Sequence, residues 1–171
     1  VDLARKLLKA EDVRNVMIVC CEAHSPFFKE NLDLDDNGKL TALTIFGDGA
    51  SAAIISKDAM EGKTAAEIID TKVATHYSES MTMVNNRAYL DKMLFKNIAP
   101  HVESLIKNLL KDNGMSIDDI DHWVMHSGGK KILNGVKNLF GLSDIQMAPS
   151  IECYQEYGNL SCASVPIALN R

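Results

Sequence analysis

WVMHSGG, residues 123–129, is the stretch of sequence that decides the fold. Its apolar residues end on His126, and two glycines follow, Gly128 and Gly129. We expect residues 121–126 to form a buried strand, because a short apolar run between charged residues is typical of one. A side chain at the carboxyl end of a strand, ahead of a glycine turn and a helix, lies where α/β proteins place functional groups. His126 is therefore a candidate catalytic residue, with a hydrogen-bonded core or rim histidine as the alternative.

Working outward from this stretch, apolar patterns of strand and helix alternate along the chain, which indicates an α/β layer architecture. The Lys130 to Leu139 stretch has the spacing of a helix, which Gly141 closes. Apolar residues from Leu90 to Leu109 predict two helices or a kinked one, because Pro100 interrupts them. Ser116 and Asp119 predict a capping box before the next strand. We expect strands at residues 16–21 (buried), 40–46, 50–56 and 67–75, with a hairpin turn at 47–49 joining the second to the third.

A second polar motif lies near the end of the chain, at residues 156–161, with the sequence EYGNLS. Asn159 follows a glycine at a junction between a loop and a helix. Its amide could project into the same cleft as His126, although an asparagine in this position can also simply cap the helix.

Three motifs that suggest ion or phosphate sites are weaker. Residues 33–38 match the first half of a calcium loop, but Thr44 stands where that loop needs a glutamate. His122 and His126 would be about 13 Å apart in a strand, too far to share a metal ion. Residues 128–131 lack the upstream glycine of a phosphate-binding loop. We therefore expect no metal ion and no bound cofactor.

Composition points to an ordinary globular protein, with 46% hydrophobic and 24% charged residues. A net charge of −5 argues against a nucleic-acid partner, which would select clustered Lys and Arg. No apolar run reaches the roughly 20 residues that span a bilayer, so we expect no membrane partner and a cytoplasmic location. The four cysteines have no CxxC spacing and are expected to be reduced and mostly buried. Both ends of the sequence lie inside apolar helical patterns, so we expect a piece of a longer protein.

Three ordered motifs make the chain resemble the type III polyketide synthases, the chalcone synthase family. Residues 46–50 (FGDGA) match the family's FGDGA segment. Residues 123–129 match its W-x-x-H-P-G-G motif, and residues 156–161 match E-Y-G-N-x-S. The resemblance covers nearly the whole chain and about half of a usual family member.

The resemblance implies a thiolase-like layered αβαβα fold, of which this chain covers the second part. Residues 1–58 would end the N-terminal thiolase-like half, and residues 59–171 would form most of the C-terminal half. It also implies a homodimer that pairs through strands near residues 50–56.

The implied activity is an acyltransferase reaction, the decarboxylative Claisen condensation of malonyl-CoA units on a cysteine-bound acyl chain. The acyl-CoA and malonyl-CoA partners are substrates rather than cofactors. His126 would pair with the thiolate and then donate to the thioester oxygen, and Asn159 would donate to the same developing enolate. The nucleophilic cysteine would lie just upstream of Val1, outside this chain. The other site residues implied are Gly128, Gly129 and Lys131 at the pantetheine entrance, Ser161 near the asparagine, and Phe46 at the junction of tunnel and cavity.

The sequence departs from the family at positions that bear on the substrate. Ser127 stands where the family usually has proline, which would loosen the turn. His24 and Phe27 replace threonines of plant members, which implies a smaller and differently polar cavity. A bacterial member that builds a small aromatic, such as a dihydroxyphenylacetyl-CoA synthase, fits these departures better than a plant chalcone synthase. Cys20 and Cys21 are expected to be structural, because an apolar strand does not activate a thiol.

Two other functions stay open. Residues 161–168 also resemble ketoacyl-carrier-protein synthase III, a fatty-acid initiation enzyme of the same fold. That family has H-Q-A-N where this chain has residues 126–129, which favours the polyketide interpretation. The third possibility is a noncatalytic thiolase-fold subunit that pairs with an active partner.

Overall fold

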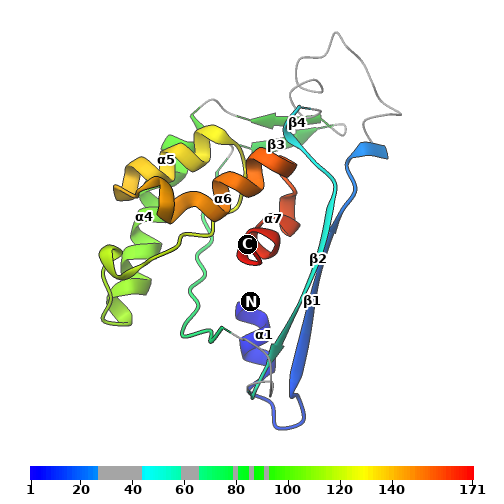
Figure 1. The fold of residues 1–171 in the computed structure, drawn as a ribbon, viewed down its shortest axis with the longest axis vertical. Coiled ribbons are helices and arrows are strands. Elements are labelled where there is room, and N and C mark those ends of the chain that lie inside the picture. The colour runs from blue at the N-terminus through cyan, green and yellow to red at the C-terminus, as the bar shows by residue number, and fades with distance from the viewer. Residues whose placement is uncertain (27–43, 59–65, 79–80, 85–86, 91–92) are drawn as a thin grey trace.

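The computed structural model describes residues 1–26, 44–58, 66–78, 81–84, 87–90 and 93–171. Figure 1 shows a long sheet on one side, a group of longer helices on the other, and short helices between them. The short helices are α1 (Asp2–Leu7) and α7 (Ser164–Leu169). The three longer helices are α4 (Leu94–Asp112), α5 (Lys130–Phe140) and α6 (Asp144–Tyr157). Within the described residues, no helix is long and apolar enough to cross a membrane.

The long sheet pairs β1 (Asn15–Glu22) with β2 (Gly49–Ser56) in antiparallel register, from Asn15 opposite Ser56 to Glu22 opposite Gly49. β2 thus takes its partner from much earlier in the chain, and no described residue of the predicted 40–46 strand pairs with it, so the predicted hairpin is not found there. Thr44 and Ile45 are helical, while residues 40–43 and the candidate calcium loop at 33–38 lie outside the described residues.

The strand predicted at residues 16–21 is confirmed, but its predicted burial is wrong. Exposed and half-buried residues alternate along β1, because α1, α7 and the short helix η2 (Ser161–Ala163) cover only one face of the sheet. A second antiparallel pair, β3 (Met81–Val84) with β4 (Arg87–Leu90), precedes α4, so the helix predicted from Leu90 begins later, at Leu94.

Two predicted strands are absent. Residues 66–78 have no regular structure and are held instead by Arg5, which donates to the Ile69 carbonyl at 3.1 Å and to Asp70 at 3.0 Å. Residues 121–126 also form no strand, since their backbone groups bond to α6 rather than to a neighbouring strand.

Helix α4 runs through Pro100 as one helix, so of the two alternatives, two helices or a kinked one, the first is wrong. Pro100 faces solvent, where water can bond the carbonyl that the proline ring leaves without a helical partner. The capping box at Ser116 and Asp119 is confirmed, and it starts the short helix η1 (Ile117–Asp119). The end of α5 at Gly141 is also confirmed, with φ of 68° in the left-handed region.

The main core lies among α4, α5 and α6. Helix α4 contributes partly buried side chains, and Phe95 passes so close to Gly135 of α5 that a Cβ there would lie 2.4 Å from its ring. The buried members of this core are Trp123, Leu133, Val136, Phe140, Leu142 and Met147. A second, smaller core joins α6 and α7 to the sheet. The segment that carries His126 begins in the first core at Trp123, and the segment that carries Asn159 leads into the second.

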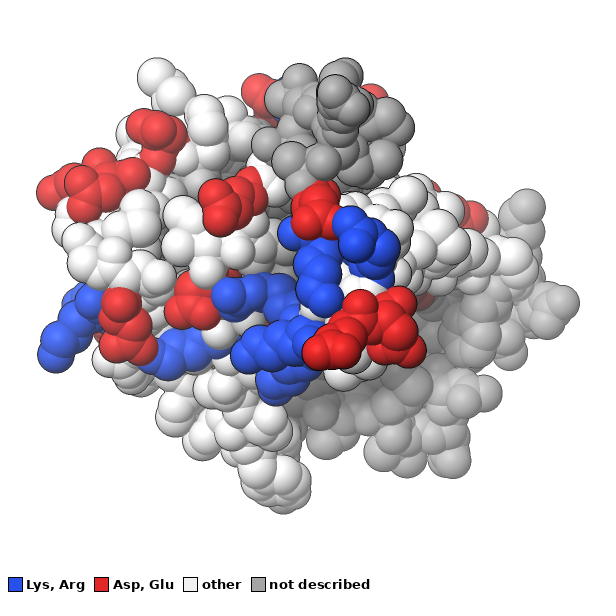
Figure 2. Space-filling view, turned by 90° about the horizontal axis from the view of Figure 1, so that it is seen from below, with Lys and Arg blue, Asp and Glu red and all other residues white. Residues whose placement is uncertain are grey.

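Charged side chains of both signs interleave on the face seen in Figure 2. Ion pairs join Lys6 to Asp2 at 2.8 Å, Lys72 to Asp112 at 2.5 Å, and Arg14 to Asp58. Such an arrangement gives no strong field of one sign on this face.

Candidate active site

The segment before His126 is held extended by helix α6. The Trp123 amide donates to the Gln146 carbonyl at 2.8 Å, and the Met125 amide donates to the Ser150 hydroxyl oxygen at 2.7 Å. The Ser150 hydroxyl in turn donates to the Trp123 carbonyl at 3.0 Å. A fully buried serine therefore performs the pairing that a neighbouring strand was expected to provide.

A tight turn follows His126. The Gly128 amide donates to the His126 carbonyl at 2.9 Å, which makes a γ-turn centred on Ser127. Ser127 has a negative φ and is 1% exposed. Gly128 lies against the histidine, since a Cβ there would be 3.3 Å from the imidazole carbon. The turn thus ends in a glycine that leaves room for the ring, and Gly129 then caps helix α5.

The Asn159 backbone is fixed by an isolated parallel bridge to Phe46. The Asn159 amide donates to the Ile45 carbonyl at 2.8 Å, and the Gly47 amide donates to the Asn159 carbonyl at 3.0 Å. The bridge requires glycine at position 47, because a Cβ there would lie 2.2 Å from the Tyr157 carbonyl oxygen. The FGDG and EYGN motifs, which are more than 100 positions apart in the sequence, are thus two sides of one backbone contact.

The Asn159 side chain is 6% exposed and is oriented by its own turn. Its carbonyl oxygen Oδ1 accepts from the Ser161 amide at 2.9 Å, so the side-chain NH₂ is the end that can donate to another molecule. Ser161 has a φ of 51°, which is unusual for a residue other than glycine. The Asn159 NH₂ group is therefore a hydrogen-bond donor held in a fixed orientation just before the short helix η2.

The His126 turn and the Asn159 turn contact each other at two points. The Ser161 backbone lies beside the His126 ring and raises the pKa of the imidazole. The Ser127 hydroxyl donates to the Gly158 carbonyl at 3.3 Å. The two contacts involve Gly158 and Ser161, which flank Asn159 and Leu160 in the sequence. The structure therefore brings the His126 turn and the Asn159 turn together, while a shared role of the two side chains stays a prediction.

His126 is exposed on one side and packed on the other. Packing around the ring removes water and lowers the pKa of the imidazole, and the bond to the Ser161 backbone opposes this effect only in part. The imidazole is therefore neutral near pH 7, and a neutral imidazole has one nitrogen that can accept a proton.

An aromatic and acidic wall lies beside the Asn159 turn. The His24 ring stacks on Phe46 with centroids 4.8 Å apart, and His24 Nδ1 lies 3.0 Å from the Gly47 carbonyl oxygen. The Asp48 carboxylate accepts from the His24 amide at 2.7 Å. Phe46 thus packs at the site rather than in a hairpin core.

Glu22 was missed by the sequence analysis. It ends β1 and accepts a hydrogen bond from the Cys162 amide at 3.4 Å. Hydrogen bonds from the side chains of Cys162 and Ser161 lower the pKa of its carboxyl group. The sequence offered one sign of its role, because Glu22 is a charged residue at the end of an apolar strand. Only the fold shows that Glu22 reaches the turn of Ser161.

The cysteines of the chain are less buried than expected. Cys153 is buried and Cys20 is half-buried, whereas Cys21 and Cys162 are exposed. A hydrogen bond to Glu22, with smaller effects from desolvation and Cys20, raises the pKa of Cys162 to about 11, and burial raises the pKa of Cys153. Neither of these two thiols is activated as a nucleophile. Cys20 and Cys21 lie within β1, and their structural role stays a prediction.

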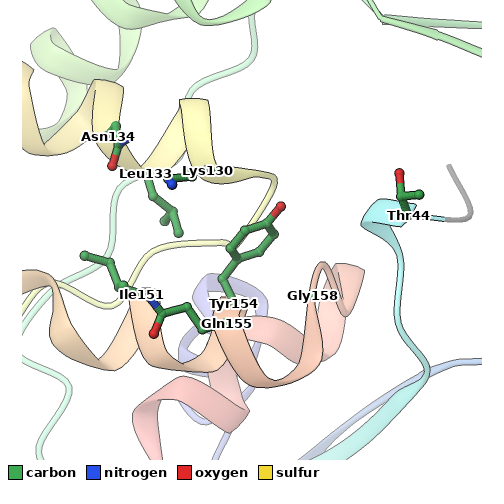
Figure 3. A pocket seen from close by; sticks show the side chains of 8 residues that line it. All are labelled: Thr44, Lys130, Leu133, Asn134, Ile151, Tyr154, Gln155 and Gly158. Carbon is green, nitrogen blue, oxygen red and sulfur yellow. The ribbon is translucent and has the colours of Figure 1, made fainter. Parts of the chain in front are cut away.

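A cavity of about 380 Å³ opens between α5, α6 and Thr44 (Figure 3). Figure 3 shows the Tyr154 ring and the Leu133 side chain directed into the space between the two helices. Lys130 and Gly158 line it and adjoin the two turns, but His126 and Asn159 do not line it. Gly128, Gly129 and Lys131 lie at the start of α5, and their predicted contact with pantetheine stays a prediction. So does the domain boundary at 58/59, which adjoins residues outside the described ranges.

Comparisons with known families agree with this arrangement. Residues 64–171 match the family model described as chalcone and stilbene synthases, C-terminal domain. Residues 1–76 match the model of 3-oxoacyl-[acyl-carrier-protein] synthase III.

Individual relatives show the same two resemblances. The chain is 31% identical to 3,5-dihydroxyphenylacetyl-CoA synthase from Amycolatopsis orientalis, over 91% of this chain and 43% of that protein. It is 28% identical to a beta-ketoacyl-[acyl-carrier-protein] synthase III from Campylobacter concisus, over 99% of this chain and 52% of that protein. The chain thus spans about half the length of the curated relatives it matches.

Among solved structures, PKS-I from the brown alga Ectocarpus siliculosus superposes with a TM-score of 0.83 at 27% identity. The superposition covers 99% of this chain and 46% of that chain. The expected α/β fold of the thiolase superfamily is thereby confirmed.

Proposed function

Because this chain belongs, over residues 64–171, to the family of chalcone and stilbene synthases, we propose that it provides the histidine and asparagine of a polyketide-forming condensing enzyme. The proposed reaction joins malonyl-CoA units to an acyl chain carried on a cysteine, which residues outside Val1–Arg171 supply. The observation that carries the proposal is the contact between the His126 turn and the Asn159 turn.

His126 serves first as a base. Its neutral ring takes the proton of the cysteine thiol, and the resulting imidazolium pairs with the thiolate. The thiolate attacks the acyl thioester, a new carbon–sulfur bond forms, and the CoA thiolate leaves. A lowered pKa suits this step, because it keeps the ring unprotonated until the cysteine approaches.

Asn159 and His126 then act together on malonyl-CoA. Loss of carbon dioxide leaves an enolate, and the side-chain NH₂ of Asn159 and the N–H of His126 both donate to its oxygen. The enolate carbon attacks the cysteine-bound thioester, so that a carbon–carbon bond forms and the cysteine leaves as thiolate. The Asn159 donor is already oriented by the Ser161 amide, and such preorganised donors are typically worth on the order of 100- to 1000-fold in rate.

The acyl group is proposed to be small. His24 stacks on Phe46, whose backbone bridges to Asn159, so that a polar ring lies beside the Asn159 turn. The similarity to a 3,5-dihydroxyphenylacetyl-CoA synthase supports a product of this size, a small aromatic built from malonyl-CoA units.

Mass spectrometry of the full-length protein with malonyl-CoA tests the proposal. Native protein should become acylated and release a polyketide, and His126→Ala should lower product formation by on the order of 100-fold or more. The matched control is His122→Ala, which removes an exposed imidazole four residues earlier. Native protein that neither takes up an acyl group nor releases carbon dioxide would refute the proposal.

A ketoacyl-carrier-protein synthase III activity is the second candidate, because residues 1–76 match that family model. The same histidine and asparagine would then act on a malonyl group carried by a carrier protein. Assays with malonyl-CoA and with malonyl-carrier protein in parallel separate the two functions. If neither donor reacts, the chain belongs to a noncatalytic partner subunit. Homodimerisation through strands near residues 50–56 stays part of the proposal and is tested by sedimentation of the full-length protein.

A further inference from the structure

We propose that Ser127 is a positioning residue, whose hydroxyl fixes the spacing between the His126 turn and the Asn159 turn. The role rests on the proposed function, since the spacing matters only if both side chains act on one substrate. At this position the family usually has proline, and in this chain the serine hydroxyl takes over the role of the proline ring.

The γ-turn at Ser127 explains why proline would fit here. The central residue of such a turn has a φ near −75°, and the proline ring holds φ near −65°. Ser127 has the required negative φ but no ring to maintain it. A second restraint is therefore needed if the His126 carbonyl is to stay bonded to the Gly128 amide at 2.9 Å.

The Ser127 hydroxyl supplies that restraint and extends it to the other turn. It is 1% exposed and donates to the Gly158 carbonyl at 3.3 Å, directly before Asn159 in the chain. The Asn159 backbone is in turn bonded to Ile45 and Gly47. One side chain thus connects the histidine turn to the bridge that holds the asparagine, which a proline ring has no donor to do.

Three substitutions of the full-length protein separate the hydrogen bond from the stiffness of the turn. Ser127→Ala removes both, Ser127→Pro restores the stiffness without the donor, and Ser127→Thr keeps the donor. We expect kcat for condensation to fall about 3- to 10-fold in Ser127→Ala and in Ser127→Pro, the range of a single hydrogen bond. KM for malonyl-CoA should stay within about twofold, and Ser127→Thr should recover most of kcat.

Ser164→Ala is the matched control. Ser164 is also buried, at 0% exposed, but among the described residues its hydroxyl has no hydrogen-bond partner. Its removal should leave both kcat and KM as they are.

Hydrogen exchange of the amides at residues 158–161 gives a readout that does not depend on activity. Exchange should speed up in Ser127→Ala and Ser127→Pro relative to the native protein. Unchanged exchange in both variants, or a native kcat in Ser127→Pro alongside a slow Ser127→Ala, would overturn the proposal. If the native protein condenses nothing, the proposed function fails, while the exchange measurement still decides whether Ser127 links the two turns.

Discussion

His126 combines a packed ring with a neutral charge state, and the cause is local. Burial of the ring lowers the pKa of the imidazole below its ordinary value of 6.5, and the Ser161 backbone opposes this effect only in part. The unfolded chain binds a proton near pH 6.5, but the folded chain does so only at lower pH. The free energy of unfolding should therefore be undiminished above about pH 6.5 and should fall as the pH drops from there through the folded pKa.

This pH dependence predicts the behaviour of a variant that cannot be protonated. His126→Asn should lose less thermal stability than the native protein between pH 7 and pH 5, measured by calorimetry. His122→Asn, on the exposed part of the same segment, should keep the native slope. Parallel curves for native protein and His126→Asn would show that the destabilising proton binds elsewhere.

Cys162 is exposed, but its thiol is predicted to react slowly. The hydrogen bond to Glu22 raises its pKa to about 11, so that about one molecule in ten thousand carries a thiolate at pH 7. Iodoacetamide should label it slowly at that pH, and Glu22→Gln, which removes the carboxylate charge, should speed the labelling. Peptide mass mapping measures both rates, and equal rates in the two proteins would contradict the assigned cause.

At the scale of the elements, the site depends on backbone contacts that admit no side chain. The Phe46–Asn159 bridge passes the Tyr157 carbonyl closely, so Gly47→Ala must push the two segments apart. We expect a loss of about 1–3 kcal/mol in the free energy of unfolding, together with loss of activity, because Asn159 moves.

Gly114→Ala is the control for this prediction. Gly114 has a φ of +68° and open space around it, so alanine there costs about 1–2 kcal/mol of backbone strain without moving the site. Urea unfolding and condensation assays on both variants should show similar losses of stability but loss of activity only for Gly47→Ala. Equal activity in both would show that the bridge does not position Asn159.

The hydrogen bonds of Ser150 in α6 to the His126 segment predict a second effect on stability. Ser150→Ala leaves the Met125 amide and the Trp123 carbonyl without the partner they have in the fold, at a cost of about 1–3 kcal/mol. Exposed Ser104→Ala on α4 should stay within about 0.5 kcal/mol of the native protein. Denaturant unfolding checks both values, and a Ser150→Ala change as small as the control would mean that the segment is held by packing alone.

At the scale of the whole molecule, one face of the β1–β2 sheet has no cover from the part of the chain that the structure describes. Met17, Val19 and Ile54 are 65%, 61% and 58% exposed, and the register places Met17 opposite Ile54 on the same face. Apolar residues gathered in this way mark a surface that another layer or another chain covers.

Residues 1–171 produced alone are therefore predicted to self-associate and to bind an apolar dye. Replacing Met17 and Ile54 by lysine should reduce association, measured by sedimentation velocity. Lysine at Val73, which is 69% exposed outside the sheet, should not. A monomeric chain with a cooperative melt would contradict the prediction.

The sequence by itself determined the features that depend on neighbouring residues. The end of α5 at Gly141, the capping box at Ser116 and the strand at residues 16–21 follow from local spacing, cap chemistry and side-chain branching. That His126 and Asn159 act in one site stays a prediction, which rests on their positions at the ends of two segments and on the resemblance of their motifs.

Only the tertiary structure decided which backbone groups bond to which. Residues 121–126 have the apolar pattern of a strand, yet Ser150 and the backbone of α6 satisfy their amides and carbonyls, and no local pattern reveals that distant partner. For the same reason β2 pairs with β1 rather than with the segment just before it, and Glu22 reaches the turn of Ser161. The packing of whole elements determines which polar groups far apart in sequence form hydrogen bonds. Each donor or acceptor pairs with the group that packing brings within about 3 Å.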